Sequence, residues 1–169
     1  MSDLERFQPD VILQSLIEHG VRFVLIGGLA AQAHGSPSLT GDMDICHARD
    51  AENLARLAAT LTELSATRRG LPFDAPRMPP LDTQTLRAGG LFTLATTAGD
   101  FVLLATPDPG FDFELLRKSA VSTRVAGHPV LVASLADLMT MKRAAGRPKD
   151  LIELEILGAL REELDRRDE

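Results

Sequence analysis

The pattern of apolar and polar residues predicts the order of the first helices and strands. Apolar side chains recur at helical spacing over residues 8–19, which predicts an amphipathic helix. A short apolar run over residues 21–26, rich in β-branched side chains, predicts a buried strand. An alanine-rich helix is expected over residues 29–34. Polar and apolar residues then alternate over residues 42–46, as in a half-buried strand.

The later part of the chain carries signals for further helices and for two hairpins. Asp50 and Ser134 are suited to cap helices, and Gly146 is suited to end the helix that Ser134 begins. Pro148 occupies the first-turn position that proline favours. These helices are expected over about 51–64, 111–118, 134–146 and 148–166, and the hairpins join 91–96 to 101–105 and 120–125 to 129–133. Residues 68–90, rich in Pro, Gly and Arg, are expected to form a long mobile connection.

This order of elements predicts a mixed α/β (α+β) fold. With 169 residues and 44% apolar composition, the chain is long enough to bury a core. We expect a single domain over 1–169, with a core of about 10–133 and a C-terminal helical segment of about 134–166. The N-terminus lacks the order of a signal peptide, and no apolar stretch is long enough to span a bilayer, so a cytoplasmic protein without a membrane partner is expected.

The charge is acidic overall but unevenly distributed. A net charge of −6 argues against a general nucleic-acid coat protein, which is normally basic. Between residues 115 and 149, however, seven basic residues face one acidic residue, Asp137. A local positive field of this kind suits a phosphate-bearing substrate, while the alternative is a set of ordinary solvated helix faces. The basic residues are Arg117, Lys118, Arg124, Lys142, Arg143, Arg147 and Lys149.

Two aspartates one residue apart are the first candidates for chemistry. Side chains two positions apart on a strand share a face, so Asp42 and Asp44 point one way while Met43 and Ile45 point to the core. Same-face carboxylates suit a hard divalent cation, Mg²⁺ or Mn²⁺, whose remaining ligands would be water and the phosphates of a nucleoside triphosphate (NTP). The alternative is a solvated edge strand.

A pair of glycines precedes these aspartates. Gly27 and Gly28 end a predicted strand and open a helix, where backbone N–H groups can approach phosphate oxygens. The segment is not a Walker A loop, because no Lys-Ser/Thr follows Gly35. An ordinary tight turn is the alternative interpretation.

The combination of an apolar strand, Gly-Gly, a helix and an Asp-Met-Asp strand resembles the nucleotidyltransferase superfamily that includes DNA polymerase β. More narrowly, "HGSPSLTGDMDI" together with "VASLADLMTMKRAAGRPKDLIELEIL" looks like the AbiEii/MenT-type nucleotidyltransferases, the toxin halves of type IV toxin–antitoxin pairs. The resemblance covers about residues 10–160. It implies a polymerase β-type nucleotidyltransferase fold, with a mixed sheet flanked by helices and a C-terminal helix pair.

The resemblance also implies an activity. It implies Mg²⁺-dependent transfer of a nucleoside monophosphate (NMP) from an NTP to an acceptor hydroxyl, with the 3′ end of a tRNA as acceptor and a cognate antitoxin as protein partner. Two alternatives stay open. One is transfer to a small molecule such as an aminoglycoside, and the other is a nucleotide-binding or protein-binding relative without catalysis.

The resemblance assigns roles to particular residues. Lys142 would neutralise the charge that develops on the transferring phosphate, and Asp150 would orient Lys142 or Arg147. The alternative for these C-terminal residues is surface ion pairing between consecutive helices. The implied nucleotide-binding set is Gly27, Gly28, Ser36, Thr40, Arg147, Lys149 and Asp150.

Two positions depart from the pattern of this family. Ser38 replaces an arginine that the family often has before its threonine. Val102 occupies the place of the third carboxylate, and Asp100, two residues earlier on the same strand face, is expected to stand in for it. The expected catalytic set is therefore Asp42, Asp44, Asp100 and Lys142, with the three aspartates as metal ligands.

Three further side chains near these elements can be weighed on type and position. His34 and His47 stand at the ends of predicted elements, where a histidine is more often a cap or surface residue than a ligand. Cys46 is the single cysteine and is expected to pack rather than act as a nucleophile.

Overall fold

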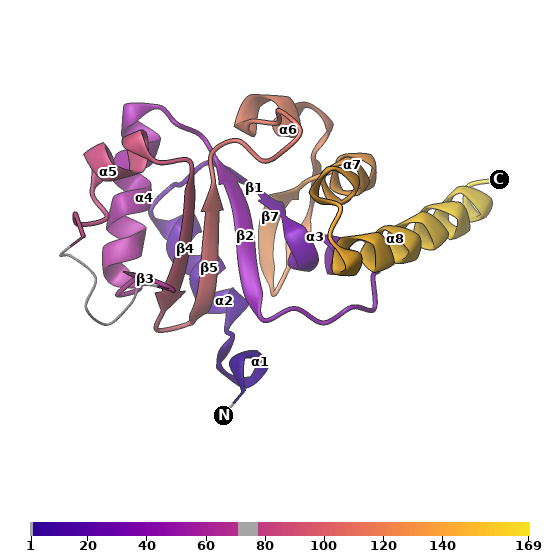
Figure 1. Ribbon diagram of the computed structural model, residues 1–169, viewed down its shortest axis with the longest axis horizontal. Coiled ribbons are helices and arrows are strands. Elements are labelled where there is room, and N and C mark those ends of the chain that lie inside the picture. Colours follow the sequence, from indigo (N-terminus) through magenta and orange to yellow (C-terminus); the bar gives the residue numbers. More distant parts are fainter. Residues whose placement is uncertain (1, 71–77) are drawn as a thin grey trace.

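The computed structural model describes residues 2–70 and 78–169, and these form a seven-stranded mixed sheet with helices on both sides (Figure 1). The strand order is β3-β4-β5-β2-β1-β7-β6. The strands are β1 (Phe23–Ile26), β2 (Asp42–His47), β3 (Thr67–Arg68), β4 (Leu91–Thr96), β5 (Gly99–Leu104), β6 (Val121–Val125) and β7 (His128–Val132). The helices are α1 (Asp3–Arg6), α2 (Pro9–Glu18), α3 (Gly27–Ala33), α4 (Ala51–Glu63), α5 (Thr83–Ala88), α6 (Phe113–Ser119), α7 (Leu135–Ala145) and α8 (Pro148–Arg167).

The centre of the sheet combines parallel and antiparallel pairs. Strand β1 runs antiparallel to β2 and parallel to β7, and β2 runs parallel to β5. All four residues of β1 are buried, as its continuous apolar sequence predicts. In β2, Met43 and Ile45 are fully buried, whereas Asp42 and Asp44 are only partly covered. The predicted alternation is therefore confirmed over residues 42–45, whereas Cys46, next to Ile45, is buried as well.

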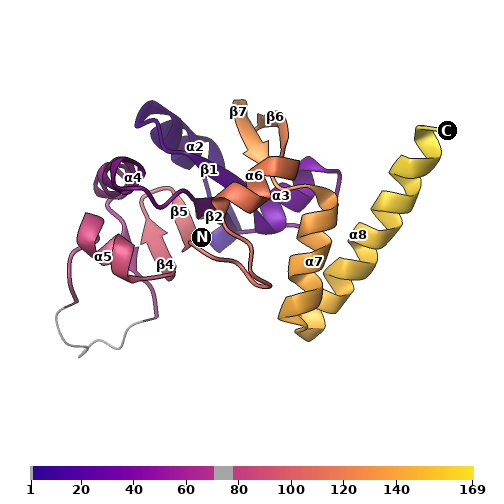
Figure 2. The same ribbon diagram turned by 90° about the horizontal axis from the view of Figure 1, so that it is seen from above.

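Helices cover the two faces of the sheet unequally. Helices α2 and α4 lie on one side, and α3 and the α7–α8 hairpin lie on the other (Figure 2). Buried side chains of the hairpin include Leu138, Met139 and Leu157, which belong to the same core as the sheet. Beyond these contacts α8 extends away from the rest of the protein (Figures 1 and 2).

The predicted capping residues take up their expected positions. Asp50 accepts a hydrogen bond from the Asn53 backbone N–H at the start of α4, and Ser134 accepts one from Asp137 at the start of α7. Gly146 ends α7 in the left-handed region, with φ of +63°.

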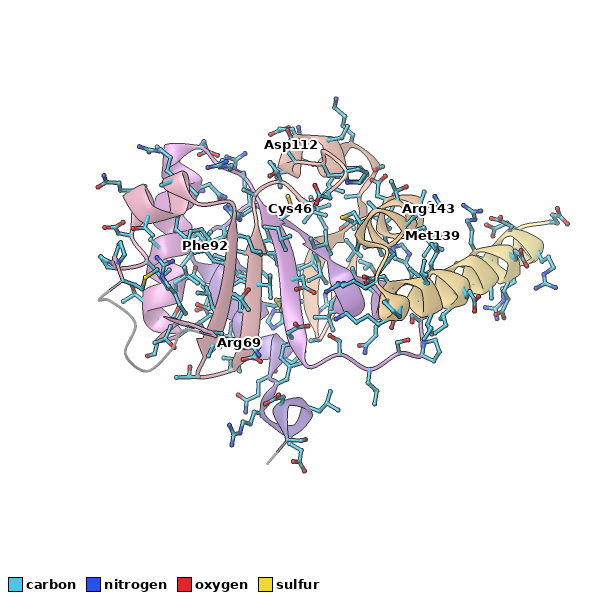
Figure 3. The ribbon with its side chains drawn as sticks, in the orientation of Figure 1. Cys46, Arg69, Phe92, Asp112, Met139 and Arg143 are labelled. Atoms are coloured by element: carbon cyan, nitrogen blue, oxygen red, sulfur yellow. The ribbon has the colours of Figure 1, made fainter. Side chains whose placement is uncertain are left out.

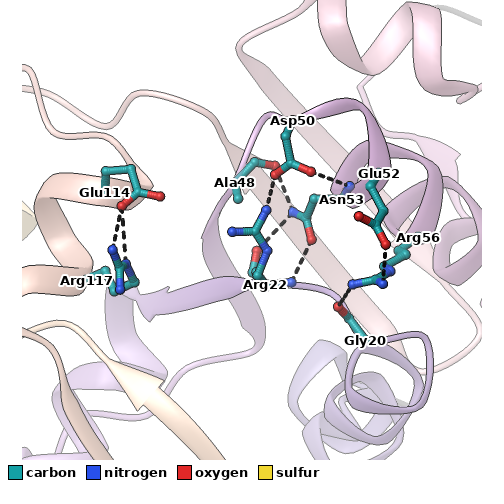
Figure 4. Close-up of polar contacts among 9 residues, drawn as sticks. All are labelled: Gly20, Arg22, Ala48, Asp50, Glu52, Asn53, Arg56, Glu114 and Arg117. Carbon is teal, nitrogen blue, oxygen red and sulfur yellow. Dashed lines mark hydrogen bonds and ion pairs between the residues drawn. The ribbon is translucent and has the colours of Figure 1, made fainter.

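A polar network fastens the ends of β1 and β2 to α4 (Figure 4). The Asn53 side chain accepts a hydrogen bond from the Arg22 backbone N–H and donates to the carbonyls of Arg22 and Ala48. The Arg22 guanidinium also pairs with Asp50. These bonds hold β2 at the end opposite Asp42, which makes the strand a firm support for its two aspartates.

The segment 68–90 differs from the predicted long connection. Strand β3, which ends at Arg68, pairs with β4 where the segment begins. Helix α5, capped by Asp82, lies within the segment. Residues 71–77 of that segment lie outside the described residues. Local composition suggested a loop because a two-residue strand and a six-residue helix are too short to show periodicity.

Helix α1 was not predicted either. It is held by a capping box, in which the Glu5 carboxylate accepts a hydrogen bond from the Ser2 N–H at 2.6 Å. Among the described residues, no helix combines the length and the apolar character needed to cross a membrane.

Candidate active site

The site is built around the two carboxylates of β2. Asp44 lies opposite Ile26 of β1 and Val102 of β5. Burial, and then the charge of Asp42, raises the pKa of Asp44 to about 7. Thr40 supports the other carboxylate by donating its hydroxyl proton to Asp42 Oδ1 at 3.1 Å. A cation bound by Asp42 and Asp44 would therefore stabilise the folded chain.

The two glycines allow α3 to begin directly against this pair. A Cβ on Gly27 would lie 2.1 Å from Asp44 Oδ2, and Gly27 has φ of +71°. A Cβ on Gly28 would lie 2.9 Å from Cβ of Thr40. Close approach of backbone to side chain thus explains both glycines. Their predicted contact with a triphosphate stays a prediction.

Replacing Gly27 by alanine is expected to destabilise the fold by about 2–5 kcal/mol. About 1–2 kcal/mol comes from the left-handed backbone, and about 1–3 kcal/mol comes from forcing Asp44 out of its place. Gly127→Ala is the matched control, because Gly127 has φ of +84° but open space at its Cβ position. Denaturant unfolding measures both. Equal losses of stability in the two variants would show that the close approach of the α3 backbone to Asp44 does not require a glycine at position 27.

Cations of the α7–α8 hairpin also act on Asp44. Lys142, Lys149 and Arg147 each lower the pKa of Asp44 through their charge, which offsets part of the effect of burial. Lys142 belongs to the last turn of α7, and the other two stand at the start of α8. The structure therefore places three of the predicted basic residues of the C-terminal segment near enough to Asp44 for their charge to act on it.

Asp150 holds two of these cations in place. Its carboxylate is fully buried and accepts a hydrogen bond from Arg147 Nε at 2.6 Å. Lys142 Nζ lies 3.4 Å from Asp150 Oδ1. The bonds from Arg147, and then the charge of Lys142, keep the pKa of Asp150 below its usual value. Asp150 thus connects the two helices of the hairpin at the end that faces Asp44.

The expected third carboxylate does not join the pair. Asp100 lies opposite Asp42 in the β2–β5 register and forms an ion pair with Arg69, whose Nη1 lies 3.1 Å from Asp100 Oδ2. Within residues 2–70 and 78–169, no three acidic, histidine or cysteine side chains form a group that could hold a metal ion. The three-aspartate metal site is therefore not assembled, because the register places Val102 beside Asp44 and Arg69 holds Asp100.

Sequence reasoning missed Arg69. Its backbone N–H donates to the Thr93 carbonyl at 2.9 Å, which extends the pairing of β3 with β4. Figure 3 shows its side chain at the end of the sheet where β5 begins. The arginine-rich composition of 68–90 was the available signal, but nothing local indicated which arginine would reach Asp100.

The loop between α3 and β2 uses its polar groups internally. The Ser36 hydroxyl is buried and accepts a hydrogen bond from the Ser38 backbone N–H at 3.3 Å. The Ser38 carbonyl accepts one from Gln32 Nε2 at 2.7 Å. Ser36 therefore shapes the loop, and its predicted contact with nucleotide stays a prediction.

The two histidines and the cysteine point elsewhere. His34 Nε2 contacts the Ala133 carbonyl at 2.8 Å. Cys46 is buried, its Sγ lies 3.6 Å from the Ala105 carbonyl, and burial raises the pKa of its thiol to about 12. His47 is fully buried rather than at the surface, and burial followed by the charge of Arg49 lowers its pKa to about 4.

His47 is expected to make the fold sensitive to acid. In the unfolded chain its pKa is about 6.5, so unfolding takes up a proton between pH 6.5 and pH 4. The contribution of His47 to the free energy of unfolding is constant above pH 6.5 and falls by about 3 kcal/mol as the pH drops to 4. Neither ring nitrogen has a hydrogen-bond partner among the described residues, so His47→Leu should remove this loss. Denaturant unfolding at pH 7 and pH 4 tests this, and the same pH dependence in both proteins would contradict it.

The side chains present fit a divalent cation. Two carboxylates on one strand face are the hard oxygen ligands that Mg²⁺ and Mn²⁺ prefer. Burial, and then the charge of Asp42, raises the pKa of Asp44, and a cation bound by the two carboxylates would favour its ionised form. Asp42 and Asp44 are the residues that would hold the ion.

The sequence matches no protein-family model and no curated protein. Among solved structures, the chain is similar to the solution structure of the antibiotic-resistance factor ANT(2'')-Ia, an aminoglycoside nucleotidyltransferase. The two are 15% identical, the match covers 93% of this chain and 89% of that chain, and the TM-score is 0.53. At this identity the likeness concerns the fold, and this chain has the polymerase β-type nucleotidyltransferase fold.

Proposed function

We propose that the protein is a Mg²⁺-dependent nucleotidyltransferase, which transfers an NMP from an NTP to an acceptor hydroxyl. The observation that carries this proposal is the pairing of opposite charges across the site. Asp42 and Asp44 present negative charge on β2, and Lys142, Arg147 and Lys149 act on Asp44 from the α7–α8 hairpin. This arrangement of charges suits a complex of a metal ion with a triphosphate, because the metal would meet the carboxylates and the phosphates would meet the basic side chains.

Each group has a defined task in this proposal. Asp42 and Asp44 hold the cation, which when bound supplies a Lewis acid for the phosphate oxygens. Lys142 neutralises charge on the transferring phosphate. Arg147 and Lys149 contact the triphosphate, and Asp150 fixes the position of Lys142 and Arg147 through the bonds described above.

The reaction is a substitution at the α-phosphorus. The acceptor oxygen forms a bond to this phosphorus while the bond to the bridging oxygen of the β-phosphate breaks, and pyrophosphate leaves. The acceptor proton passes to the carboxylate of Asp100, which lines a cavity together with Asp42.

For the acceptor, the proposal follows the sequence resemblance to the AbiEii/MenT-type enzymes. The acceptor is then the 3′ end of a tRNA, and an antitoxin protein is the partner that checks the activity. The basic residues at the start of α8 support an acceptor that carries phosphate.

A second candidate is transfer to a small molecule. Two observations favour it. The structural neighbour ANT(2'')-Ia acts on aminoglycosides, and three aspartates, Asp3, Asp42 and Asp100, line the cavity beside the pair. Such a lining attracts a cationic acceptor.

Incubation with Mg²⁺, each radiolabelled NTP and either total RNA or an aminoglycoside tests both candidates. Labelled tRNA supports the first, and a labelled aminoglycoside supports the second. Binding of NTP without label on either acceptor would favour a nucleotide-binding relative that lacks catalysis.

A further inference from the structure

A cavity of about 320 Å³ opens beside Asp42, and Arg69 is the cationic residue in its wall. It lies where β2 and β5 begin, and Arg69 and Asp100 face each other in it. Asp42, one of the two carboxylates that would hold the metal, also belongs to its wall. A group bound in this cavity therefore lies next to the proposed reaction centre.

The N-terminal segment completes the wall of the cavity. Asp3 and Leu4 of α1 line it. The segment is fastened to the β4–β5 turn, because the Gln8 N–H donates to the Ala98 carbonyl at 2.8 Å. At the next residue a Cβ on Gly99 would lie 3.0 Å from Phe7 Cα, so the backbones meet closely there. The cavity is thus formed by four separate parts of the chain rather than by one loop.

The contact between Arg69 and Asp100 leaves groups of both side chains available. They meet through one pair of atoms, Arg69 Nη1 and Asp100 Oδ2. The second carboxylate oxygen and the other guanidinium N–H groups are not used in that contact. Arg69 is 39% exposed and Asp100 is 21% exposed, so a ligand in the cavity can reach both.

A carboxylate beside a guanidinium matches two neighbouring hydroxyl groups. The carboxylate accepts a hydrogen bond from one hydroxyl, and the guanidinium donates to the oxygen of the other. A phosphate fits less well, because it would meet the repulsion of Asp3, Asp42 and Asp100 around one arginine. An uncharged sugar edge avoids this repulsion.

We propose that Arg69 and Asp100 form the acceptor subsite and recognise a vicinal diol of a sugar. This inference rests on the proposed nucleotidyl transfer, and it names the part of the acceptor that the protein holds. The terminal ribose of an RNA carries such a diol, and a sugar ring of a small-molecule acceptor can carry one too, so the subsite is compatible with either acceptor candidate. Arg69 is then the residue that selects a diol over a single hydroxyl.

Binding of a simple sugar tests the subsite without any reaction. We would titrate methyl β-D-ribofuranoside, and its 2-deoxy analogue, into the metal-free protein and follow the Arg69 side-chain N–H signal by NMR. The signal is assigned by its loss in Arg69→Gln. The riboside is expected to shift it and to bind about five-fold more tightly than the deoxy sugar, as one hydrogen bond of about 1 kcal/mol predicts. No shift, or equal affinity for the two sugars, would overturn the proposal.

Matched variants separate the subsite from a general effect on the fold. Arg69→Gln and Asp100→Asn should abolish riboside binding but leave NTP affinity unchanged. Arg68→Gln is the control, because Arg68 is the neighbouring residue and lies over the Phe92 ring instead. Riboside binding that persists in Arg69→Gln, or that is lost equally in Arg68→Gln, contradicts the assignment.

Transfer assays then identify the source of the diol. A tRNA that ends in 2′-deoxyadenosine keeps its 3′-hydroxyl but lacks the diol, and it should be labelled less than normal tRNA if RNA is the acceptor. Label on the riboside alone indicates a free sugar. Equal labelling of the two tRNAs would overturn diol recognition. Pyrophosphate release with no acceptor at all would refute the proposed function, and the NMR titration would still decide whether the diol binds.

Discussion

Asp44→Asn is expected to abolish metal-dependent NTP binding and to lower nucleotidyl transfer by about 100- to 1,000-fold. The substitution keeps the size of the side chain but removes one of the two charges that would hold the cation. Asp42→Asn should act in the same direction. Calorimetric titration of NTP with Mg²⁺ measures the binding, and pyrophosphate release measures the transfer. Asp165→Asn, an exposed aspartate near the end of α8, is the control.

The same substitution should stabilise the metal-free fold. The pKa of Asp44 is raised from 3.8 to about 7, so ionising this carboxyl costs free energy in the folded chain. The free energy of unfolding is therefore highest below pH 3.8, and it falls by about 4 kcal/mol as the pH rises through 7. Asp44→Asn should therefore be more stable than the wild type above pH 7 and similar to it near pH 4. Denaturant unfolding in the presence of a chelator checks this. Equal stability at pH 8, together with unchanged NTP affinity, would refute the metal site.

Lys142→Ala is expected to lower turnover by about 100-fold while weakening NTP binding much less. The ammonium group acts on Asp44 from α7, and its proposed task is to stabilise charge that develops only during transfer. Steady-state kinetics gives kcat, and calorimetry gives the affinity for NTP. A loss confined to affinity would mean that Lys142 binds the ground state instead.

Arg143→Ala controls for the general effect of removing a positive charge. Arg143 is the next residue of α7 and is exposed (Figure 3). Lys142, by contrast, is the cation that lowers the pKa of Asp44 most. Similar kinetics in the two variants would place Lys142 among ordinary surface charges.

Local patterns predicted the framework of the site. The carboxylate pair follows from the two-residue period of a strand, and the buried position of Met43 between Asp42 and Asp44 confirms it. The caps at Asp50 and Ser134 follow from residue preferences that act within four residues. These features depend on neighbours in sequence, so they could be predicted from the sequence alone.

Features that depend on register and on distant segments could not be predicted. Whether Asp100 faces Asp42 or Asp44 is decided by the pairing of β2 with β5, and one residue of slip changes the neighbour. Arg69 reaches Asp100 because β3 pairs with β4, and the bond of Gln8 to the β4–β5 turn helps to hold Asp3 at the cavity. Tertiary contacts alone specify these positions.

The most direct test of the central claim compares two labels on one reaction. The purified protein is incubated with Mg²⁺ and an NTP labelled on either the α- or the γ-phosphate, with total RNA and an aminoglycoside offered as acceptors. The proposed function predicts that the α label moves to an acceptor, that the γ label leaves as pyrophosphate, and that Asp44→Asn does neither. Transfer of the γ label to an acceptor, or the same α transfer by Asp44→Asn, would contradict it.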